Sequence, residues 1–302
     1  MDNCFKLHFF SSRNVSREER RGKHVHEQRR SPSLDPQPGA ALMLGAPRAA
    51  LGSIGTASLA SARETGGIVL IFLRSLRALC LGRLDRTEFK RSMLSFGEAS
   101  LPVVLATAAF TGMIMVLQSA IYVEQFGVYN MVGWFMGFTT LRELGPVLMA
   151  LMFSGRVGAN NASELASMKV NEQLDALRIL AIDVDELLVA PRTLSMILSL
   201  LVLVVVGDCV AVFAGAVCAR VLMGVDYQVF LRSLVEGVTP ADFTTGVGKA
   251  VVFGWLIAVV SIHFGVTAKG GSTGVGRAVN AQVVGCAVAI FVADYLMTSL
   301  IR

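Results

Sequence analysis

The chain has 302 residues, of which 54% are hydrophobic and only 16% charged, and its mean hydropathy is +0.61. Because roughly a quarter of the residues in soluble domains are charged, this composition indicates an integral membrane protein and argues against a soluble domain. The five cysteines are scattered and contain no C-x-x-C pair, so they predict neither a disulfide framework nor a zinc site.

Positive charge is concentrated in the N-terminal third of the chain. Residues 1–98 contain 16 lysines and arginines against 9 acidic residues, whereas residues 99–302 contain 11 against 13. A basic flank beside apolar segments is typical of the cytoplasmic side of a membrane protein and of contact with anionic lipid headgroups. We therefore expect no binding of nucleic acid.

The first 62 residues differ in composition from the rest. They mix charge, proline and serine without periodic apolar positions, as in "RNVSREERRGKHVHEQRRSPSLDPQPGA", and such a segment cannot bury enough surface to fold. We expect a disordered basic tail over residues 1–62, followed by one membrane domain over residues 63–302. His24 and His26 lie in this tail, where solvated histidines are far commoner than metal ligands, so no metal site is predicted.

A basic but apolar segment, "GGIVLIFLRSLRALCLGRL", occupies residues 66–84. Its arginines Arg74, Arg77 and Arg83 stand among isoleucine, leucine and phenylalanine. This pattern predicts an interfacial helix that lies in the headgroup plane, with the arginines extending toward water.

Long uncharged runs follow, and their lengths predict the membrane crossings. A helix needs about 20 predominantly apolar residues to cross the hydrocarbon core. The fold class predicted in this way is an all-α integral membrane protein with five transmembrane helices. The predicted spans are residues 99–123, 125–155 (interrupted by Arg142 and Glu143), 193–219 (containing Asp208), 250–268 and 278–301 (containing Asp294).

Basic residues in the loops predict the orientation of these spans. The segment 123–133 has no lysine or arginine, whereas the segment 156–192 has four. By the positive-inside rule, we expect the N-terminus in the cytoplasm and the C-terminus outside.

One charged stretch, "ASMKVNEQLDALRIL" at residues 166–180, lies between the second and third predicted spans. On a helical wheel Val170, Leu174, Leu177 and Ala181 form a narrow apolar stripe, and charged residues occupy the other faces. The segment is too charged to cross a membrane, so we expect a helix on the cytoplasmic side. The pattern leaves two interpretations, a connecting helix that rests on the bilayer and a docking helix whose polar face meets a soluble partner.

The glycine-rich stretch "GSTGVGRA", which begins at Gly271, resembles a phosphate-binding loop but lacks its essential residues. Arg277 and Ala278 stand where a P-loop has lysine and serine or threonine. H-E-x-x-H does not occur, and His263 stands alone in a span. We therefore expect a tight cytoplasmic turn at this stretch, and no catalytic residue and no cofactor in this chain.

An ordered series of motifs in the membrane domain resembles a known family. The sequence "LRELGPVLMALMFSGRVGANNASELASMKVNEQLDALRILAIDVDELLVAPR", residues 141–192, is similar to the signature region of the MlaE/YrbE permeases, the membrane subunits of lipid-transporting ABC systems. The resemblance continues through "KAVVFG" at 249–254, "GGSTGVGRA" at 270–278 and "VADYLMTSL" at 292–300, and it covers roughly residues 65–302.

The resemblance implies a set of partners and a location. The expected assembly is a homodimer of five-span subunits in the bacterial inner membrane. It would be docked on cytoplasmic ATPase subunits, which bind ATP and Mg²⁺, and on a periplasmic ring of MCE-domain proteins that carry lipid. ATP hydrolysis is then expected in a partner chain.

Within this resemblance the charged helix matches the cytoplasmic coupling helix of the family, with Glu172 and Gln173 at the matching "EQ". The docking interpretation is then the expected one. The residues expected to contact the ATPase are Lys169, Val170, Glu172, Gln173, Leu174, Asp175 and Leu177.

Charged side chains inside a span cost about 2.5 to 3.5 kcal/mol each at the membrane centre, so each one indicates a partner or an aqueous cavity. Arg142 and Glu143 point about 100° apart on a helix, so adjacency alone does not make them a pair. Both can lie in headgroup water at the outer end of the second span. The family's matching "RELGP" implies instead a place beside an outward-facing lipid cavity, with Arg142 available to a phosphate, Glu143 shaping access and Pro146 loosening the helix.

Three further candidate lipid contacts lie in the first span: Met115, Gln118 and Tyr122. Flexible methionines adapt to acyl chains of varied shape.

Asp208 and Asp294 are expected to have structural roles, either in a pair with a base such as Arg220 or as caps of a neighbouring helix.

The favoured hypothesis is the membrane-spanning half of an ATP-driven phospholipid transporter, in which the ATPases pull on the coupling helices. Two alternatives remain open. One is an ion-coupled secondary transporter that uses Asp208 and Asp294, and the other is a non-transporting membrane scaffold for the MCE partner.

Overall fold

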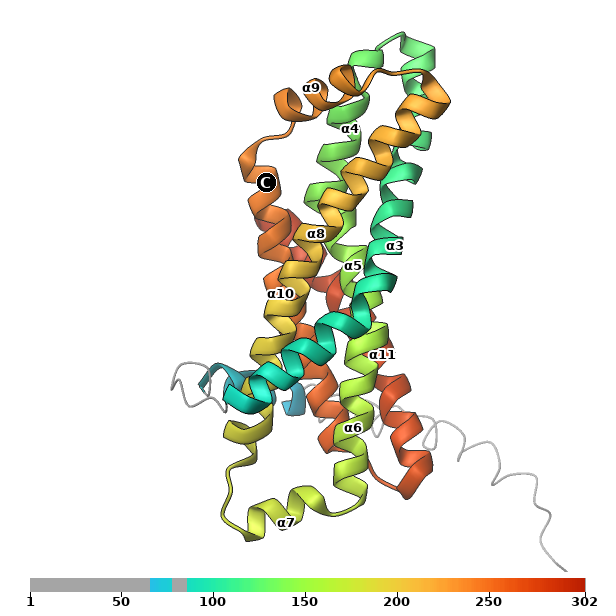
Figure 1. Cartoon of the computed structure of the whole chain (residues 1–302). Helices are drawn as coiled ribbons and strands as arrows, with labels where there is room; N and C mark the ends of the chain where they lie inside the picture. Colours follow the sequence, from blue (N-terminus) through green and yellow to red (C-terminus); the bar gives the residue numbers. More distant parts are fainter. Residues whose placement is uncertain (1–65, 78–85, 302) are drawn as a thin grey trace, which may run out of the picture. The chain divides into compact units, whose positions relative to one another are not determined.

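The computed structural model describes residues 66–77 and 86–301 of the chain, and the structural statements below concern these residues. Within them the regular secondary structure is helical, with short turns between helices and without a strand. Figure 1 shows long helices that run beside one another. The predicted tail over residues 1–62 and the last part of the predicted interfacial segment lie outside the described residues.

Nine labelled α-helices follow one another along the chain. They are α3 (Arg86–Phe126), α4 (Val132–Thr139), α5 (Gly145–Phe153), α6 (Ala159–Val170), α7 (Gln173–Ile179), α8 (Ala190–Met223), α9 (Tyr227–Gly237), α10 (Pro240–Val266) and α11 (Gly271–Leu300). A 3₁₀ turn (Tyr129–Met131) and three π-helical segments (Thr140–Leu144, Ser154–Gly158 and Asp185–Val189) connect some of them.

Four helices in the described part of the chain are long and apolar enough to cross a membrane. They are Ser100–Val123, Asp185–Met223, Pro240–Val266 and Gly271–Leu300. These helices overlap four of the five predicted spans, and the third of them begins ten residues before the predicted start at residue 250 because α10 has a capping box at Thr239.

The predicted span over residues 125–155 is built differently. It consists of α4, with 8 residues, and α5, with 9 residues, joined by the π-helical segment Thr140–Leu144. A second π-helical segment, Ser154–Gly158, leads on into α6. Helical structure therefore continues from Val132 to Val170, but no long regular α-helix forms.

Residues 66–77 form the first described helix, which packs against the bundle. The ring of Phe72 stacks on Trp255 of α10 with centroids 4.1 Å apart, and Trp255 Nε1 donates a hydrogen bond to Ser75 Oγ at 2.9 Å. Ile71 is buried, whereas Arg74 and Arg77 are exposed. This division into a packed face and a basic exposed face has the pattern expected of an interfacial helix.

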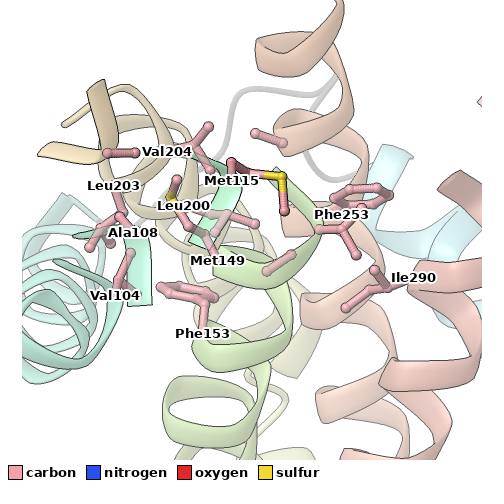
Figure 2. Packing of buried hydrophobic residues seen from close by; sticks show 14 of the residues in the cluster. Val104, Ala108, Met115, Met149, Phe153, Leu200, Leu203, Val204, Phe253 and Ile290 are labelled. Carbon is pink, nitrogen blue, oxygen red and sulfur yellow. The ribbon is translucent and has the colours of Figure 1, made fainter. Parts of the chain in front are cut away.

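The apolar core lies where α3, α5, α8, α10 and α11 meet, and Figure 2 shows its packing. Its members include Val104, Ala108, Met149, Phe153, Leu200, Val204, Phe253 and Ile290. Lipid tails are as apolar as these side chains, so close packing rather than exclusion from water holds such helices together in a membrane.

The charged segment between α6 and α8 is not one continuous helix. The prediction of a single helix over residues 169–181 is therefore wrong. α6 ends at Val170, and α7 comprises only Gln173–Ile179. Glu172 and Ala181 have φ values of 59° and 57°, in the left-handed region that interrupts a helix. The chain turns at Glu172, and this turn lets Leu174 pack into a cluster with Leu165 and Leu188.

The glycine-rich stretch is also more helical than predicted. α11 begins at Gly271, so "GSTGVGRA" forms the first turns of a helix, and only a short connection separates it from Val266. Gly270 makes this turn possible because its φ of 93° lies where residues with a Cβ atom are strained.

Candidate functional site

A lysine buried completely among apolar helices is the most unusual feature of the bundle. Lys249 lies in α10, and its side chain is 0% exposed. Its Nζ forms an ion pair with Glu143, lies 2.8 Å from Asp294 Oδ1 of α11 and donates a hydrogen bond to Thr298 Oγ1 at 2.8 Å. An unpaired buried ammonium group would be strongly unfavourable, so the two carboxylates are what permits a lysine at this position.

A second ion pair adjoins the first. Arg142 Nη1 donates to Asp242 Oδ1 at 2.9 Å, and Arg142 Nε lies 3.8 Å from Glu143 Oε1. Asp242 is held in place because its Oδ2 accepts hydrogen bonds from Thr239 N (3.0 Å) and Thr239 Oγ1 (2.6 Å) in the capping box of α10. The Arg142 guanidinium also lies over the ring of Phe138, 5.3 Å from its centroid.

These five side chains, Asp242, Arg142, Glu143, Lys249 and Asp294, form one continuous charged network. Three carboxylates face two cations, so with all groups ionised one negative charge is not balanced within the network. Arg142, Glu143 and Asp294 are its partly accessible members, with side chains 23%, 28% and 22% exposed. The arrangement presents cations and carboxylates in apolar surroundings, where they can bind polar or charged groups.

Arg142 and Glu143 are positioned by a π-helical segment. Gly145 N donates to the carbonyl of Thr140, five residues earlier, in place of the α-helical partner four residues earlier. Pro146 explains the local departure from α-helix, because a proline ring clashes with the carbonyl four residues before it. The predicted loosening of this helix thus takes the form of a π-helical turn, a feature frequent at functional sites.

A glycine in α10 lets this segment come close to Lys249. A Cβ atom on Gly246 would collide with the backbone carbonyl of Leu141. Lys249 lies one turn after Gly246, and Glu143 lies two residues after Leu141. The close approach of the two backbones therefore brings the carboxylate and the ammonium group together.

The predicted lipid contacts of the first span do not share one environment. Met115 is buried in the apolar core (Figure 2), whereas Gln118 and Tyr122 are exposed. No hydrogen bond or ion pair among the described residues joins these three side chains to Arg142 or Glu143. The structure brings the predicted Arg142 and Glu143 together and leaves the other three apart from them.

Asp294 has an ionic partner, but the base is Lys249 rather than Arg220. Arg220 pairs instead with Asp226, 3.2 Å away. Asp208 is 2% exposed, and neither of its oxygens has a hydrogen-bond partner among the described residues. Its Oδ1 faces Gly145, where an added Cβ atom would lie 2.9 Å away. Asp208 therefore lies beside the same π-helical segment.

Lys249 and Asp242 are members of the candidate site that the sequence analysis did not single out. The predicted span began at Ala250, which left the lysine in the preceding loop. A signal was present in the sequence "TPAD", residues 239–242, because threonine followed three residues later by an acidic residue is typical of a helix N-terminus. A helix that begins there necessarily carries Lys249 in its interior.

A second candidate site surrounds α7, the predicted coupling helix. Lys169 Nζ lies 2.7 Å from Asp175 Oδ2, and Arg178 Nη1 lies 3.1 Å from Asp175 Oδ1. The hydrogen bond from Lys169 is the largest influence and lowers the pKa of the Asp175 carboxyl. Desolvation opposes it, and the charges of Lys169 and Arg178 then lower the pKa further. The triplet is accessible, because the side chains of Lys169, Asp175 and Arg178 are 29%, 44% and 59% exposed.

The apolar residues of α7 divide into a buried anchor and an exposed end. Leu174 is 0% exposed and packs in a cluster with Ile71 and Leu188, so it faces the protein's own core. Ile179 and Leu180 are 85% and 69% exposed at the end of the helix. The predicted contact residues Glu172 and Gln173 are also exposed, whereas Val170 and Leu177 are partly buried.

A buried arginine joins the elements around α7. Arg192 at the start of α8 is 3% exposed. Its guanidinium nitrogens lie 2.9 Å from Glu164 Oε1 and from Asn161 Oδ1 in α6, and 3.4 Å from Glu88 Oε1 in α3. Asn161 Nδ2 in turn donates to Ser261 Oγ in α10 at 2.9 Å. Movement of α6 would thereby be transmitted to three other helices.

The part of the chain that the structure describes contains no group of three or more histidine, cysteine, aspartate or glutamate side chains that could hold a metal ion. The carboxylates of the charged network are separated by the cations between them.

Most of the chain is similar in sequence to known proteins. The family model described as Permease MlaE matches residues 89–300. A probable ABC transporter permease protein of Rickettsia conorii is 34% identical over 248 residues, which cover 82% of this chain and 96% of that protein. A probable ABC transporter permease protein of Synechocystis is 33% identical over 228 residues, 76% of this chain and 85% of its own length. The chloroplastic protein TRIGALACTOSYLDIACYLGLYCEROL 1 of Arabidopsis thaliana is 33% identical over 229 residues, 76% of this chain and 64% of its own length.

Proposed function

The chain belongs to the MlaE family of ABC transporter permeases, and we propose that it is the membrane-spanning subunit of an ATP-driven lipid transporter. The observation that carries the proposal is the charged network. Five charged side chains lie among otherwise apolar helices, and Arg142 and Glu143 are accessible within it. An amphiphilic lipid has one charged end and long apolar chains, so a site that combines charged side chains with an apolar surface can bind it.

In this proposal Arg142 binds the phosphate of the lipid. Its planar guanidinium can donate two parallel hydrogen bonds to a phosphate, and an incoming phosphate would replace its contact with Asp242. Glu143 and Lys249 hold the π-helical segment in place. Gln118 and Tyr122, exposed on α3, and Met115 beneath them are proposed to line the path of the acyl chains.

The membrane topology has five spans in this proposal. The four long apolar helices are joined by a fifth crossing made of α4, the π-helical segment Thr140–Leu144 and α5, whose irregular backbone is acceptable because it is packed against α8 and α10. An odd number of crossings places the two termini on opposite sides. The basic N-terminal third favours a cytoplasmic N-terminus in the bacterial inner membrane and a periplasmic C-terminus.

The α7 region is proposed to receive a cytoplasmic ATPase. Glu172 and Gln173, with the exposed Ile179 and Leu180, offer polar and apolar contacts together. ATP-driven closure of the ATPase would move α6 and α7, and Arg192 would carry that movement to α3 and α8. A second copy of this chain and a periplasmic MCE-domain protein complete the proposed assembly.

Gentle purification from membranes, followed by mass spectrometry of the proteins and lipids that remain bound, tests the proposal. We expect an ABC ATPase, an MCE-domain protein and phospholipid to remain with the chain. The variant Ile179→Glu should lose the ATPase and keep the lipid, because Ile179 is exposed and takes no part in the core. Recovery of the ATPase at wild-type yield with this variant would contradict the role of α7.

The ion-coupled alternative draws support from Asp208, a buried carboxyl group without a hydrogen-bond partner among the described residues. Asp294 supports it less, because Lys249 already pairs with it. Dissipation of the proton gradient at constant ATP separates the two mechanisms. Lipid transfer that stops under these conditions would favour the ion-coupled transporter, and transfer that continues favours the ATP-driven one.

A further inference from the structure

A cavity of about 390 Å³ opens between α3 and the junction of α5 and α6. It is lined by Ser95 and Phe96 of α3, by the π-helical segment Ser154–Gly158 and by Asn160 of α6. The volume lies within the range of about 300 to 1,000 Å³ typical of small-molecule sites. The charged network uses none of these residues, so the cavity is a separate feature.

Three hydrogen-bond donors converge on this cavity without partners of their own. Arg156, Asn160 and Ser95 are exposed, and none of their side chains has a hydrogen bond or ion pair with a described residue. Beside them, Phe96 and Val157 are 4% and 2% exposed and form an apolar wall. A guanidinium, an amide and a hydroxyl together match a phosphate, and the apolar wall matches the glycerol and the first carbons of an acyl chain.

The charges around the cavity favour a single negative charge. Arg91 and Glu98 lie one turn on either side of Ser95 on the same helix, and both are exposed. Together with Arg156 they amount to a net charge of +1, which a phosphodiester balances. A phosphate monoester with two negative charges would be less well matched.

The position of the cavity along the chain places it at a membrane boundary. Ser95 lies five residues before the candidate span that begins at Ser100. Arg156 is the first charged residue after the apolar run of α5. Basic pockets between membrane helices on the cytoplasmic side are typical sites for the headgroups of anionic lipids.

We propose that Arg156, Asn160 and Ser95 form a binding site for the phosphodiester headgroup of an anionic phospholipid, on the side of the membrane that carries α7. The site is distinct from Arg142, and it does not depend on the proposed transport function, since a bound lipid could equally be a structural or regulatory ligand. Arg156 makes the principal contact, and its partners orient the headgroup.

Native mass spectrometry of the full chain in detergent tests this site, with dioctanoyl phosphatidylglycerol, dioctanoyl phosphatidylcholine and inorganic phosphate as probes. We expect Arg156→Gln to weaken binding of phosphatidylglycerol about ten-fold, because charge-assisted hydrogen bonds to a phosphate are lost. Arg86→Gln is the matched control: it removes the same charge from the opposite face of α3 and should leave binding unchanged. Phosphatidylcholine should bind more weakly than phosphatidylglycerol in the wild type.

Equal binding by the Arg156→Gln and Arg86→Gln variants would overturn the site. If inorganic phosphate displaced phosphatidylglycerol at equimolar concentration, the ligand would be a soluble anion and the lipid assignment would be wrong. Asn160→Asp provides a second test if Arg156→Gln does not fold, because this nearly isosteric change places a negative charge in the cavity and should also weaken binding. Full transport activity in a variant that no longer binds phosphatidylglycerol would leave the proposed transport function intact, so the two proposals fail separately.

Discussion

The charged network and the triplet of Lys169, Asp175 and Arg178 beside α7 have similar ion-pair geometry but different surroundings. Distances between nitrogen and oxygen are 2.8 and 2.9 Å in two pairs of the network and 2.7 and 3.1 Å in the triplet. Lys249 is 0% exposed, however, whereas Lys169 is 29% exposed. The distance alone therefore does not determine how much an ion pair contributes to stability. Burial determines how much free energy of unfolding is lost when one partner is removed.

Loss of the buried lysine should have the largest effect. In Lys249→Met the carboxylates of Glu143 and Asp294 would lose the cation that lies between them, and removal of one partner of a buried pair costs about 3 to 5 kcal/mol. We expect a marked loss of folded protein and a lower midpoint of thermal unfolding in detergent. Lys169→Met is the matched control, and an equal loss of stability in both variants would show that burial does not separate the two regions.

Next in size is the apolar anchor of α7. Leu174→Ala should destabilise the packing of α7 by about 2 to 5 kcal/mol, because it leaves a cavity in the cluster with Ile71 and Leu188. Hydrogen exchange should then become faster in α7 and stay slow in α10. Slow exchange in α7 of this variant would mean that the ion pairs, rather than Leu174, hold the helix.

A smaller effect on stability, but a clear one on transport, is expected for Glu143→Gln. The substitution leaves two cations and two carboxylates in the charged network, so its charges balance and the fold should be retained. Transport should fall about ten-fold or more, equivalent to about 1.4 kcal/mol, if the accessible carboxylate controls access for lipid. Wild-type transport in this variant would assign the network a structural role only.

We expect Asp175→Asn to have the smallest effect on stability. A carboxyl group with a lowered folded-state pKa stabilises the structure above its ordinary pKa, and this contribution is lost as the pH falls through the lowered value. Amide exchange in α7 should therefore be only slightly faster in the variant at pH 7, since exposed ion pairs contribute little. The difference should disappear as the pH falls through the lowered pKa of Asp175, because the carboxyl is then protonated and neutral, as the asparagine is.

Sequence patterns predicted features that depend on local composition. The four long apolar helices follow from uncharged runs of sufficient length, whereas the interfacial position of residues 66–77 stays a prediction. Arg142 and Glu143 stand out in the sequence as candidate site residues because a charged side chain is costly in lipid. Each of these inferences needs only the residue and its neighbours in the chain.

Features that depend on contacts between distant segments were not predictable in the same way. The partner of Glu143 is 106 residues away in the chain, and its meeting with Lys249 depends on the approach of Leu141 to Gly246. The break at Glu172 comes two residues before Leu174, whose buried contacts with Ile71 and Leu188 lie outside the segment and cannot be read from its own pattern. A helical wheel over residues 169–181 requires a single helix axis, whereas the chain forms the end of α6 and the separate helix α7 in this segment.

The central claim is that this chain moves lipid by using the energy of a partner ATPase. Its most direct test is transfer of a fluorescent phospholipid by vesicles that contain the chain, the co-purified ATPase and the MCE-domain protein, with ATP at constant concentration. We predict transfer with the complete complex and ATP, no transfer by the chain alone, and transfer about ten-fold slower or more, with continued ATP hydrolysis, in Glu143→Gln. Lipid transfer by the isolated chain without the ATPase would contradict the account.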